Sequence, residues 1–157
     1  MKVVAKAKWF SILQANRNDE VVACADEVLV IAVDGDGNML FVEEPSPAFG
    51  GRQLFLPGGE AKDGEDVLEA AQRELREETG FAAGKLELVG TLRPWPKYLQ
   101  VTSRYVLATQ LYPSPLTPDE DYPLVLHRKS RAQVQAMIAD GEISDTRIVA
   151  AVGMWFP

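Results

Sequence analysis

Residues 58–81, GGEAKDGEDVLEAAQRELREETGF, contain a regular spacing of apolar residues. Leu68, Ala71 and Leu75 recur at three- and four-residue spacing, and this periodicity predicts a helix over about residues 66–79. The three apolar side chains form one narrow stripe, which is the face that we expect to pack against the rest of the protein.

Three carboxylates lie beside this stripe near the C-terminal end of the predicted helix, and we call them the helix glutamates: Glu74, Glu77 and Glu78. Like charges three and four residues apart repel, and the helix dipole disfavours carboxylates at this end by a few tenths of a kcal/mol each. A solvated acidic face is the simple interpretation. Hard oxygen ligands on a rigid element instead favour a site for Mg²⁺ or Mn²⁺. The preceding turn LPGG, which lets backbone approach a ligand closely, supports the second interpretation.

Composition restricts the class of protein. The chain has 157 residues, 46% hydrophobic and 25% charged, which fits one globular domain over residues 1–157. A net charge of −7 argues against nonspecific binding of nucleic acid but not against a small anionic substrate. The start of the chain lacks a signal-peptide stretch, and no apolar run approaches the roughly 18 residues of a membrane span. We therefore expect no membrane partner and a cytoplasmic location.

Outside the helix, the apolar runs at residues 27–33 and 39–44 predict two strands joined by a hairpin turn, DGDGN, at residues 34–38. A calcium loop is the alternative for this turn, but Pro45 stands where the glutamate ligand of such a loop would be. Further strands are predicted at residues 9–15, 20–25, 54–59, 85–92 and 103–112. A capping box at residues 130–133 predicts a helix that begins there and runs through residue 139. A last helix is predicted over residues 144–154. This mixture predicts an α/β sandwich.

The opening stretch resembles the Nudix box, which is Gly, five residues, Glu, seven residues, Arg-Glu, an aliphatic residue, any residue, Glu-Glu, any residue, Gly and an apolar residue. Every fixed position is filled, by Gly59, Glu65, Arg73, Glu74, Leu75, Glu77, Glu78, Gly80 and Phe81. The resemblance implies a Nudix α/β/α sandwich with a mixed sheet and a central catalytic helix. It also implies a metal-dependent pyrophosphohydrolase that takes Mg²⁺, or Mn²⁺ in its place.

The resemblance assigns roles to individual residues of the box. The helix glutamates correspond to catalytic metal ligands, and the carbonyl of Gly59 corresponds to a further ligand. Arg73 corresponds to the residue that orients a ligand carboxylate, and Glu65 to a supporting contact that water can mediate. On this hypothesis, the metal ions and the phosphates of the substrate offset the repulsion among the helix glutamates.

The stretch after the box, RPWPKYLQVTSRYVLATQLYPSPLTPDEDYPL, resembles Nudix hydrolases of ADP compounds in its loop residues Pro96 and Tyr98 and in its VLATQLYP strand. The resemblance implies hydrolysis of ADP-ribose, NADH or diadenosine polyphosphates to AMP and a second phosphate, with Pro96 and Tyr98 contacting the substrate. A nucleoside-triphosphate pyrophosphohydrolase is one alternative. A noncatalytic Nudix domain that senses a nucleotide is another.

Three assignments complete the predicted site and assembly. Glu120, in the acidic loop at residues 113–123, is the first candidate for the catalytic base, and a solvated loop is the alternative. Arg52 is a candidate contact for a substrate phosphate. Related ADP-ribose hydrolases often exchange N-terminal strands in a homodimer, and the short segment before Val28 leaves a homodimer open here.

Overall fold

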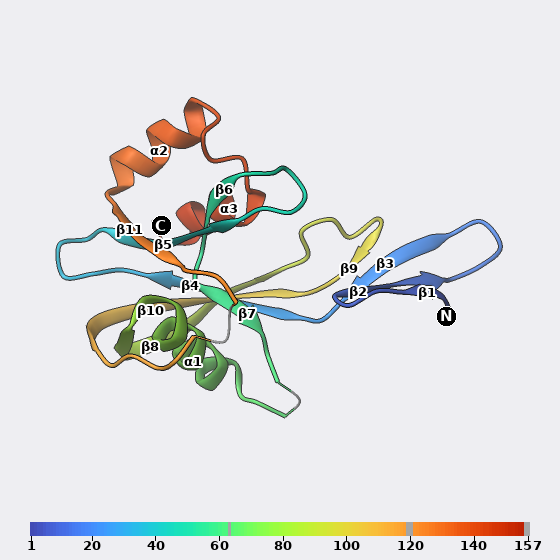
Figure 1. Cartoon of the computed structure of the whole chain (residues 1–157), viewed down its shortest axis with the longest axis horizontal. Coiled ribbons are helices and arrows are strands. Elements are labelled where there is room, and N and C mark those ends of the chain that lie inside the picture. The colour runs from blue at the N-terminus through green and yellow to red at the C-terminus, as the bar shows by residue number, and fades with distance from the viewer. Residues whose placement is uncertain (63, 119–120, 156–157) are drawn as a thin grey trace.

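The structure, a computed structural model, describes residues 1–62, 64–118 and 121–155 (Figure 1). Its strands are β1 (Lys2–Lys6), β2 (Phe10–Gln14), β3 (Glu20–Cys24), β4 (Glu27–Ala32), β5 (Met39–Pro45), β6 (Arg52–Phe55), β7 (Gly58–Glu60), β8 (Phe81–Leu92), β9 (Leu99–Gln100), β10 (Ser103–Pro113) and β11 (Val125–Lys129). Its helices are α1 (Val67–Thr79), α2 (Arg131–Ala139) and α3 (Thr146–Trp155).

The central sheet has the strand order β7-β4-β10-β8, with β4 parallel to β10 and the other pairs antiparallel. Side chains alternate along β4: Val28 and Val30 pack in a core with α1, whereas Leu29 and Ile31 pack in a core with α2 and α3. This two-residue period places helices on both faces of a mixed sheet. The predicted α/β sandwich is therefore confirmed.

The turn at residues 34–38 reverses the chain, but the predicted hairpin is wrong. Val33 and Met39 form an isolated bridge, after which β5 leaves for a second sheet of order β11-β5-β6. The cause is that β4 is paired on both of its edges, with β7 and β10, so β5 must find other partners. Asp34 Oδ1 accepts from the backbone N–H of Asp36 and of Asn38, at 3.0 and 2.9 Å, which explains the turn without calcium.

The central helix α1 lies where the sequence predicts it. Asp66 is its N-cap, since its carboxylate accepts from the backbone N–H of Leu68 at 2.8 Å. Gly80 closes the helix in the left-handed conformation, with φ of 76°. The predicted capping box of Ser130 and Gln133 is also present at the start of α2.

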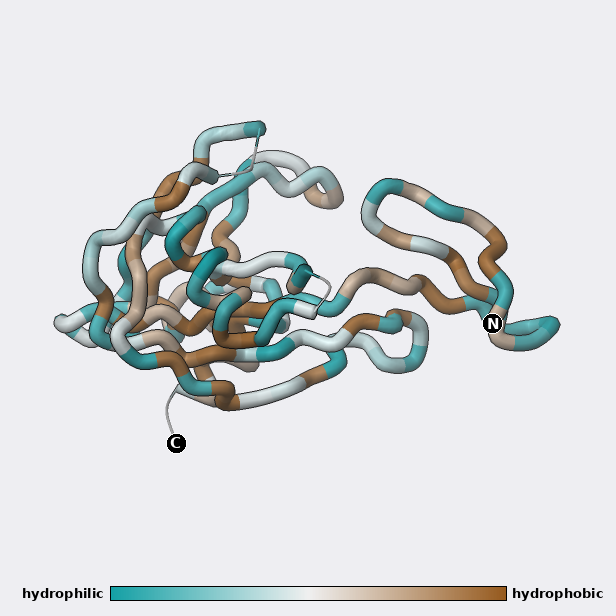
Figure 2. Tube along the Cα trace, turned by 90° about the horizontal axis from the view of Figure 1, so that it is seen from below, coloured by the Kyte–Doolittle hydropathy of each residue, from teal (hydrophilic) through white to brown (hydrophobic). Residues whose placement is uncertain are grey.

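The N-terminal part of the chain forms a third sheet, of order β1-β2-β3-β9, which projects from the rest of the molecule (Figure 1). All residues of β1 are exposed, and Val3 and Val4 retain 55% and 53% of their accessible surface. Figure 2 shows that hydrophobic segments occur in this projecting sheet as well as inside the body. In the described part of the chain, no helix combines the length and apolar character that a membrane crossing requires.

Candidate active site

Glu74 is a buried carboxylate held between α1 and β7. It is 6% exposed, and it lies next to Leu75, one of the apolar residues of α1 that pack on the central sheet. A Cβ atom at Gly59 would lie 2.7–3.0 Å from the Glu74 carboxylate, and one at Gly58 would collide with the backbone of Val28. Both positions favour glycine because the backbone of β7 passes close to other atoms. At Gly59 these belong to the Glu74 carboxylate, a candidate metal ligand, and at Gly58 to the backbone of strand β4.

Arg73 links the acidic residues of the box. Its Nη1 donates to Glu74 Oε1 at 2.6 Å and to Glu77 Oε2 at 3.0 Å. Its Nε and Nη2 donate to the two carboxylate oxygens of Glu65 at 2.9 and 3.0 Å, and Nη2 also donates to the carbonyl of Glu60 at 3.2 Å. One guanidinium therefore offsets part of the repulsion among the helix glutamates before any ion binds.

The electrostatics around Arg73 follow from these contacts. The hydrogen bonds from Arg73 lower the pKa of Glu65 to about 2, although desolvation opposes the shift. The same contact with Glu65 is the largest cause that raises the pKa of Arg73, with contributions from Glu74 and Glu77. Arg73 and Glu65 are therefore a fixed ion pair over the ordinary range of pH.

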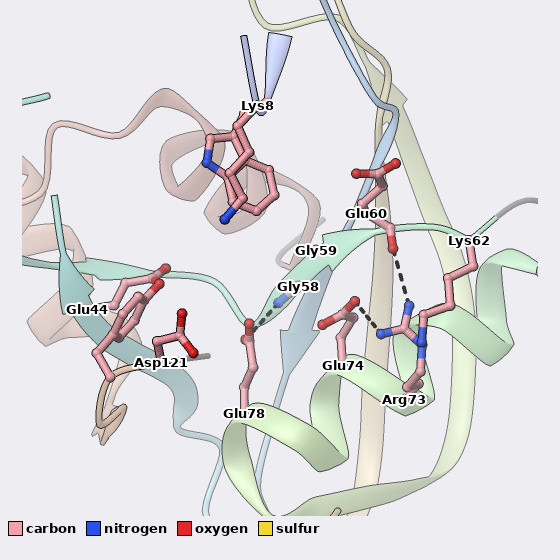
Figure 3. A pocket seen from close by; sticks show the side chains of 12 residues that line it. Lys8, Glu44, Gly58, Gly59, Glu60, Lys62, Arg73, Glu74, Glu78 and Asp121 are labelled. Carbon is pink, nitrogen blue, oxygen red and sulfur yellow. Dashed lines mark hydrogen bonds and ion pairs between the residues drawn. The ribbon is translucent and has the colours of Figure 1, made fainter. Parts of the chain in front are cut away.

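A cavity of about 560 Å³ opens in front of α1 and β7 (Figure 3). On one side lie Glu74, Arg73 and Glu78, whose Oε2 accepts from the backbone N–H of Gly58 at 2.9 Å. On the other side lie Glu44 of β5 and Asp121 of the loop before β11. The complete lining is Lys8, Trp9, Glu44, Gly58, Gly59, Glu60, Lys62, Arg73, Glu74, Glu78, Asp121 and Tyr122.

Lys8 and Trp9, which belong to no motif of the sequence, reach this cavity from the connection between β1 and β2. The Lys8 ammonium lies over the Trp9 ring, 4.2 Å from its centroid, and Trp9 is 70% exposed. The sequence signal was a lysine next to a tryptophan at the start of a strand. That signal alone does not reveal that the two side chains line a cavity with residues about fifty positions further along the chain.

The oxygen donors at this end of α1 fit a divalent cation, although only Glu74 and Glu78 of the helix glutamates line the cavity and Glu77 does not. Among residues 1–62, 64–118 and 121–155, no three carboxylates stand together as a finished ligand set. The reason is visible in the contacts: Glu74 and Glu77 both accept from Arg73, and Glu78 accepts from Gly58. The side chains are nevertheless carboxylates on one helix, beside a glycine that leaves room for their oxygens. Such all-oxygen sets suit Mg²⁺ and Mn²⁺.

The predicted substrate residues lie at different places in the structure. Arg52 binds Glu43 and the carbonyl of Pro123 and does not line the cavity. Pro96 lines a separate hollow of about 500 Å³ between the projecting sheet and the body, and Tyr98 packs edge to face on Trp95. Within one chain, these residues are not brought together with the helix glutamates. Glu120 lies outside the described residues.

Comparison with known proteins identifies the family. The family model for the NUDIX domain matches residues 25–157. The chain therefore belongs to the Nudix family, and the predicted family, fold and pyrophosphohydrolase class are confirmed. Nudix hydrolases generally need a divalent metal, which agrees with the all-oxygen donor set.

Several relatives carry a hydrolase name. The ADP compounds hydrolase NudE of Escherichia coli (strain K12) is 32% identical over 126 residues, which are 80% of this chain and 68% of that protein. An ADP-ribose pyrophosphatase of Mycobacterium tuberculosis is 29% identical over 136 residues, which are 85% of this chain and 66% of that protein. The chain thus spans about two thirds of the length of these curated relatives. A crystal structure of an ADP compounds hydrolase matches with a TM-score of 0.81 and 27% identity, covering 98% of this chain and 88% of that one.

Proposed function

We propose that this protein hydrolyses the pyrophosphate bond of ADP linked to a second moiety, such as ADP-ribose, NADH or a diadenosine polyphosphate. The products are AMP and the phosphate of the other moiety. The observation that carries the proposal is the cavity in which Glu74, Glu78 and Gly59 of the box face an exposed aromatic ring, that of Trp9. The names of the two curated relatives support the same substrate class.

We further propose Mg²⁺ as the physiological ion, with Mn²⁺ able to replace it. The helix glutamates and the carbonyl of Gly59 would hold the metal. When bound, a divalent ion neutralises the charge of the phosphates and lowers the pKa of the attacking water. Arg73 orients Glu74 and Glu77 through its Nη1, and Glu65 in turn fixes Arg73. Both carboxylates are thereby held at one end of α1, and a bound ion would compete with Arg73 for their oxygens.

Other residues of the cavity are suited to bind the nucleobase and a phosphate of the substrate and to accept a proton. The exposed ring of Trp9 offers a face on which a nucleobase can stack, and Lys8 beside it offers a charge to a phosphate. A carboxylate of the acidic loop takes the proton from the attacking water. Glu120 stays our first prediction for that base, and Asp121 is the member of the loop that lines the cavity.

The test is a substrate panel with Mg²⁺: ADP-ribose, NADH, diadenosine triphosphate and nucleoside triphosphates, with the products separated by chromatography. We expect AMP from ADP-ribose or the dinucleotides. Pyrophosphate released from a triphosphate would instead identify the nucleoside-triphosphate class and overturn the proposal.

The variant Glu78→Gln tests the metal assignment in the same assay. Its side-chain carbonyl can still accept from Gly58, so the fold should persist while turnover falls by about 100-fold or more. Glu87→Gln is the matched control, because Glu87 is an exposed carboxylate on β8 that pairs only weakly with Lys85 at 3.2 Å. Unchanged turnover in Glu78→Gln would refute the assignment of Glu78 as a ligand.

We also propose that the protein acts as a homodimer of single Nudix domains over residues 1–157, in the cytoplasm. The support for the dimer is the projecting N-terminal sheet. Val3, Val4 and Phe10 are 45–55% exposed there, a large apolar surface for a sheet that no helix covers in the described part of the chain (Figure 1). A second copy of the chain would cover this surface and give the sheet a partner.

A further inference from the structure

Arg52, which was predicted to contact a substrate phosphate, instead binds Glu43 and the carbonyl of Pro123 and does not line the cavity. From β6, its Nε donates to Glu43 Oε1 at 3.0 Å, and its Nη2 donates to the carbonyl of Pro123 at 2.8 Å and to the carbonyl of Glu43. All these acceptors belong to the protein. A guanidinium is suited to this task because its donors lie in one rigid plane and can bind several acceptors at once.

The carbonyl that Arg52 binds belongs to the segment that forms one wall of the cavity. Asp121 and Tyr122 of that wall line the cavity directly before Pro123. Tyr122 donates its hydroxyl to Glu44 Oε2 at 2.6 Å, and Glu44 also lines the cavity. The wall is therefore attached to the second sheet at two successive residues.

Strand β5 makes one attachment directly, through Glu44, and supports the other through Glu43, which binds Arg52. Glu43 and Glu44 are neighbours in β5, so their side chains point to opposite sides of the sheet. Glu44 faces the cavity and binds Tyr122. Glu43 binds Arg52 and, through its other carboxylate oxygen, His127 Nε2 at 2.7 Å. The contact with His127, followed by that with Arg52, lowers the pKa of Glu43, so its carboxylate stays charged and available to Arg52.

The far end of the same connection is held in the same way. Arg76, in the last turn of α1, donates to the carbonyl of Ser114 at 2.9 Å. An arginine thus binds a backbone carbonyl at each end of the segment between β10 and β11. One anchor comes from the helix that carries the candidate metal ligands, and the other comes from the second sheet.

We propose that Arg52 is a positioning residue, which holds the wall of Asp121 and Tyr122 in the conformation that binds the substrate. This inference rests on the proposed function, since it concerns the same cavity. Without Arg52, the wall is in place in only a fraction of the free molecules and must be ordered when substrate binds. The apparent Kd then equals the intrinsic Kd divided by that fraction, so the affinity is lower. The effect therefore falls on KM and leaves kcat nearly unchanged.

The primary test compares Arg52→Gln and Arg52→Lys in hydrolysis of ADP-ribose with Mg²⁺. We expect KM to rise about tenfold in Arg52→Gln, the size of one lost charge-assisted hydrogen bond, with kcat within about twofold. Arg52→Lys should resemble Arg52→Gln, because an ammonium cannot bind Glu43 and Pro123 in one plane. If Arg52 contacted a substrate phosphate instead, lysine would retain most of the affinity, and that result would overturn the proposal.

Arg128→Gln is the matched control. Arg128 lies on β11 of the same sheet and pairs with Asp34 at 3.7 Å, so the variant removes an arginine–carboxylate pair without touching the wall. We expect its KM to equal that of the wild type. An equal rise of KM in Arg128→Gln would show a general effect of the sheet and would contradict the role of Arg52.

Two further measurements test whether Arg52 and Tyr122 hold the same wall. Arg52→Gln and Tyr122→Phe should be non-additive in KM, because both release the same wall. Additive effects would count against a shared wall. Amide hydrogen exchange over residues 121–126 should be faster in Arg52→Gln than in the wild type, and unchanged exchange would also overturn the proposal. Exchange needs no turnover, so wild-type protein that is inactive on ADP-ribose would refute the proposed function while exchange still tested Arg52.

Discussion

At the scale of the residue, Gly59 is the position where one methyl group should separate activity from stability. In Gly59→Ala, the new Cβ would lie 2.7–3.0 Å from the Glu74 carboxylate, which is the end of a side chain and would have to shift from its place beside Arg73. We expect kcat/KM to fall at least tenfold, because a displacement of about 1 Å in a ligand can cost 10²-fold. The free energy of unfolding should fall by only about 1 kcal/mol, the lower end of the cost of overpacking, because the group that must shift is the end of a side chain.

Gly35→Ala serves as the control for this substitution. A Cβ at Gly35 meets no atom within 4 Å, and the residue lies in the turn between β4 and β5, away from the cavity. Steady-state kinetics and urea unfolding of both variants give the comparison. Equal kinetics in the two variants would show that Gly59 does not restrict Glu74.

The ion pair of Glu65 and Arg73 predicts how stability depends on acid. The pKa of Glu65 is about 2 in the folded protein and about 4.3 in an unfolded chain, so the unfolded state binds more protons between these values. The contribution is therefore complete above about pH 4.5 and is lost as the pH falls toward 2. Urea unfolding at a series of pH values should show a shallower acid loss in Glu65→Gln than in the wild type.

Glu87→Gln is again the suitable comparison for the pH series, because its surface pair with Lys85 contributes little. Its curve should run parallel to that of the wild type. A Glu65→Gln curve that is also parallel to the wild type would contradict the depressed pKa.

At the scale of the element, the two left-handed glycines that follow helices differ in what they support. Gly80 ends α1 with φ of 76°, next to Glu77 and Glu78, and Gly141 follows α2 with φ of 78°. Alanine at either position should cost about 1–2 kcal/mol of stability, because both must keep a conformation that a Cβ disfavours. Only Gly80→Ala should also lower kcat/KM, by several-fold, since it disturbs the last turn of α1. Thermal unfolding and kinetics at 25 °C measure the two effects.

The elements also show which parts of the structure were predictable. The range of α1 and the capping box at Ser130 depend on residues within a few positions of one another, and the sequence predicted both. The partners of β5 depend on which edges of β4 are already occupied, and the same DGDGN turn is compatible with either arrangement. The contacts of Lys8 and Trp9 with the cavity, and of Arg52 with Pro123, join distant segments and have no local signal.

At the scale of the whole molecule, the projecting sheet predicts a change of assembly when its apolar surface is made polar. We expect the wild type to have a mass of twice the 17.3 kDa of one chain by light scattering. The double variant with Val3→Asp and Val4→Asp should give a single chain, because burying two charges in the interface is costly. Val149→Asp is the control, since Val149 is 44% exposed on α3, outside the projecting sheet. A wild type that is already monomeric would refute the dimer.

The position of Arg73 also bears on how the protein depends on its metal supply. Because its guanidinium already sits between Glu74 and Glu77, the acidic end of α1 has an internal counter-ion from the moment the chain folds. Newly made protein in a magnesium-poor medium should therefore fold without the ion and stay folded, although it is inactive. An incoming ion must compete with that arginine for the same oxygens, so catalysis would respond to magnesium over a range in which the amount of folded protein stays constant.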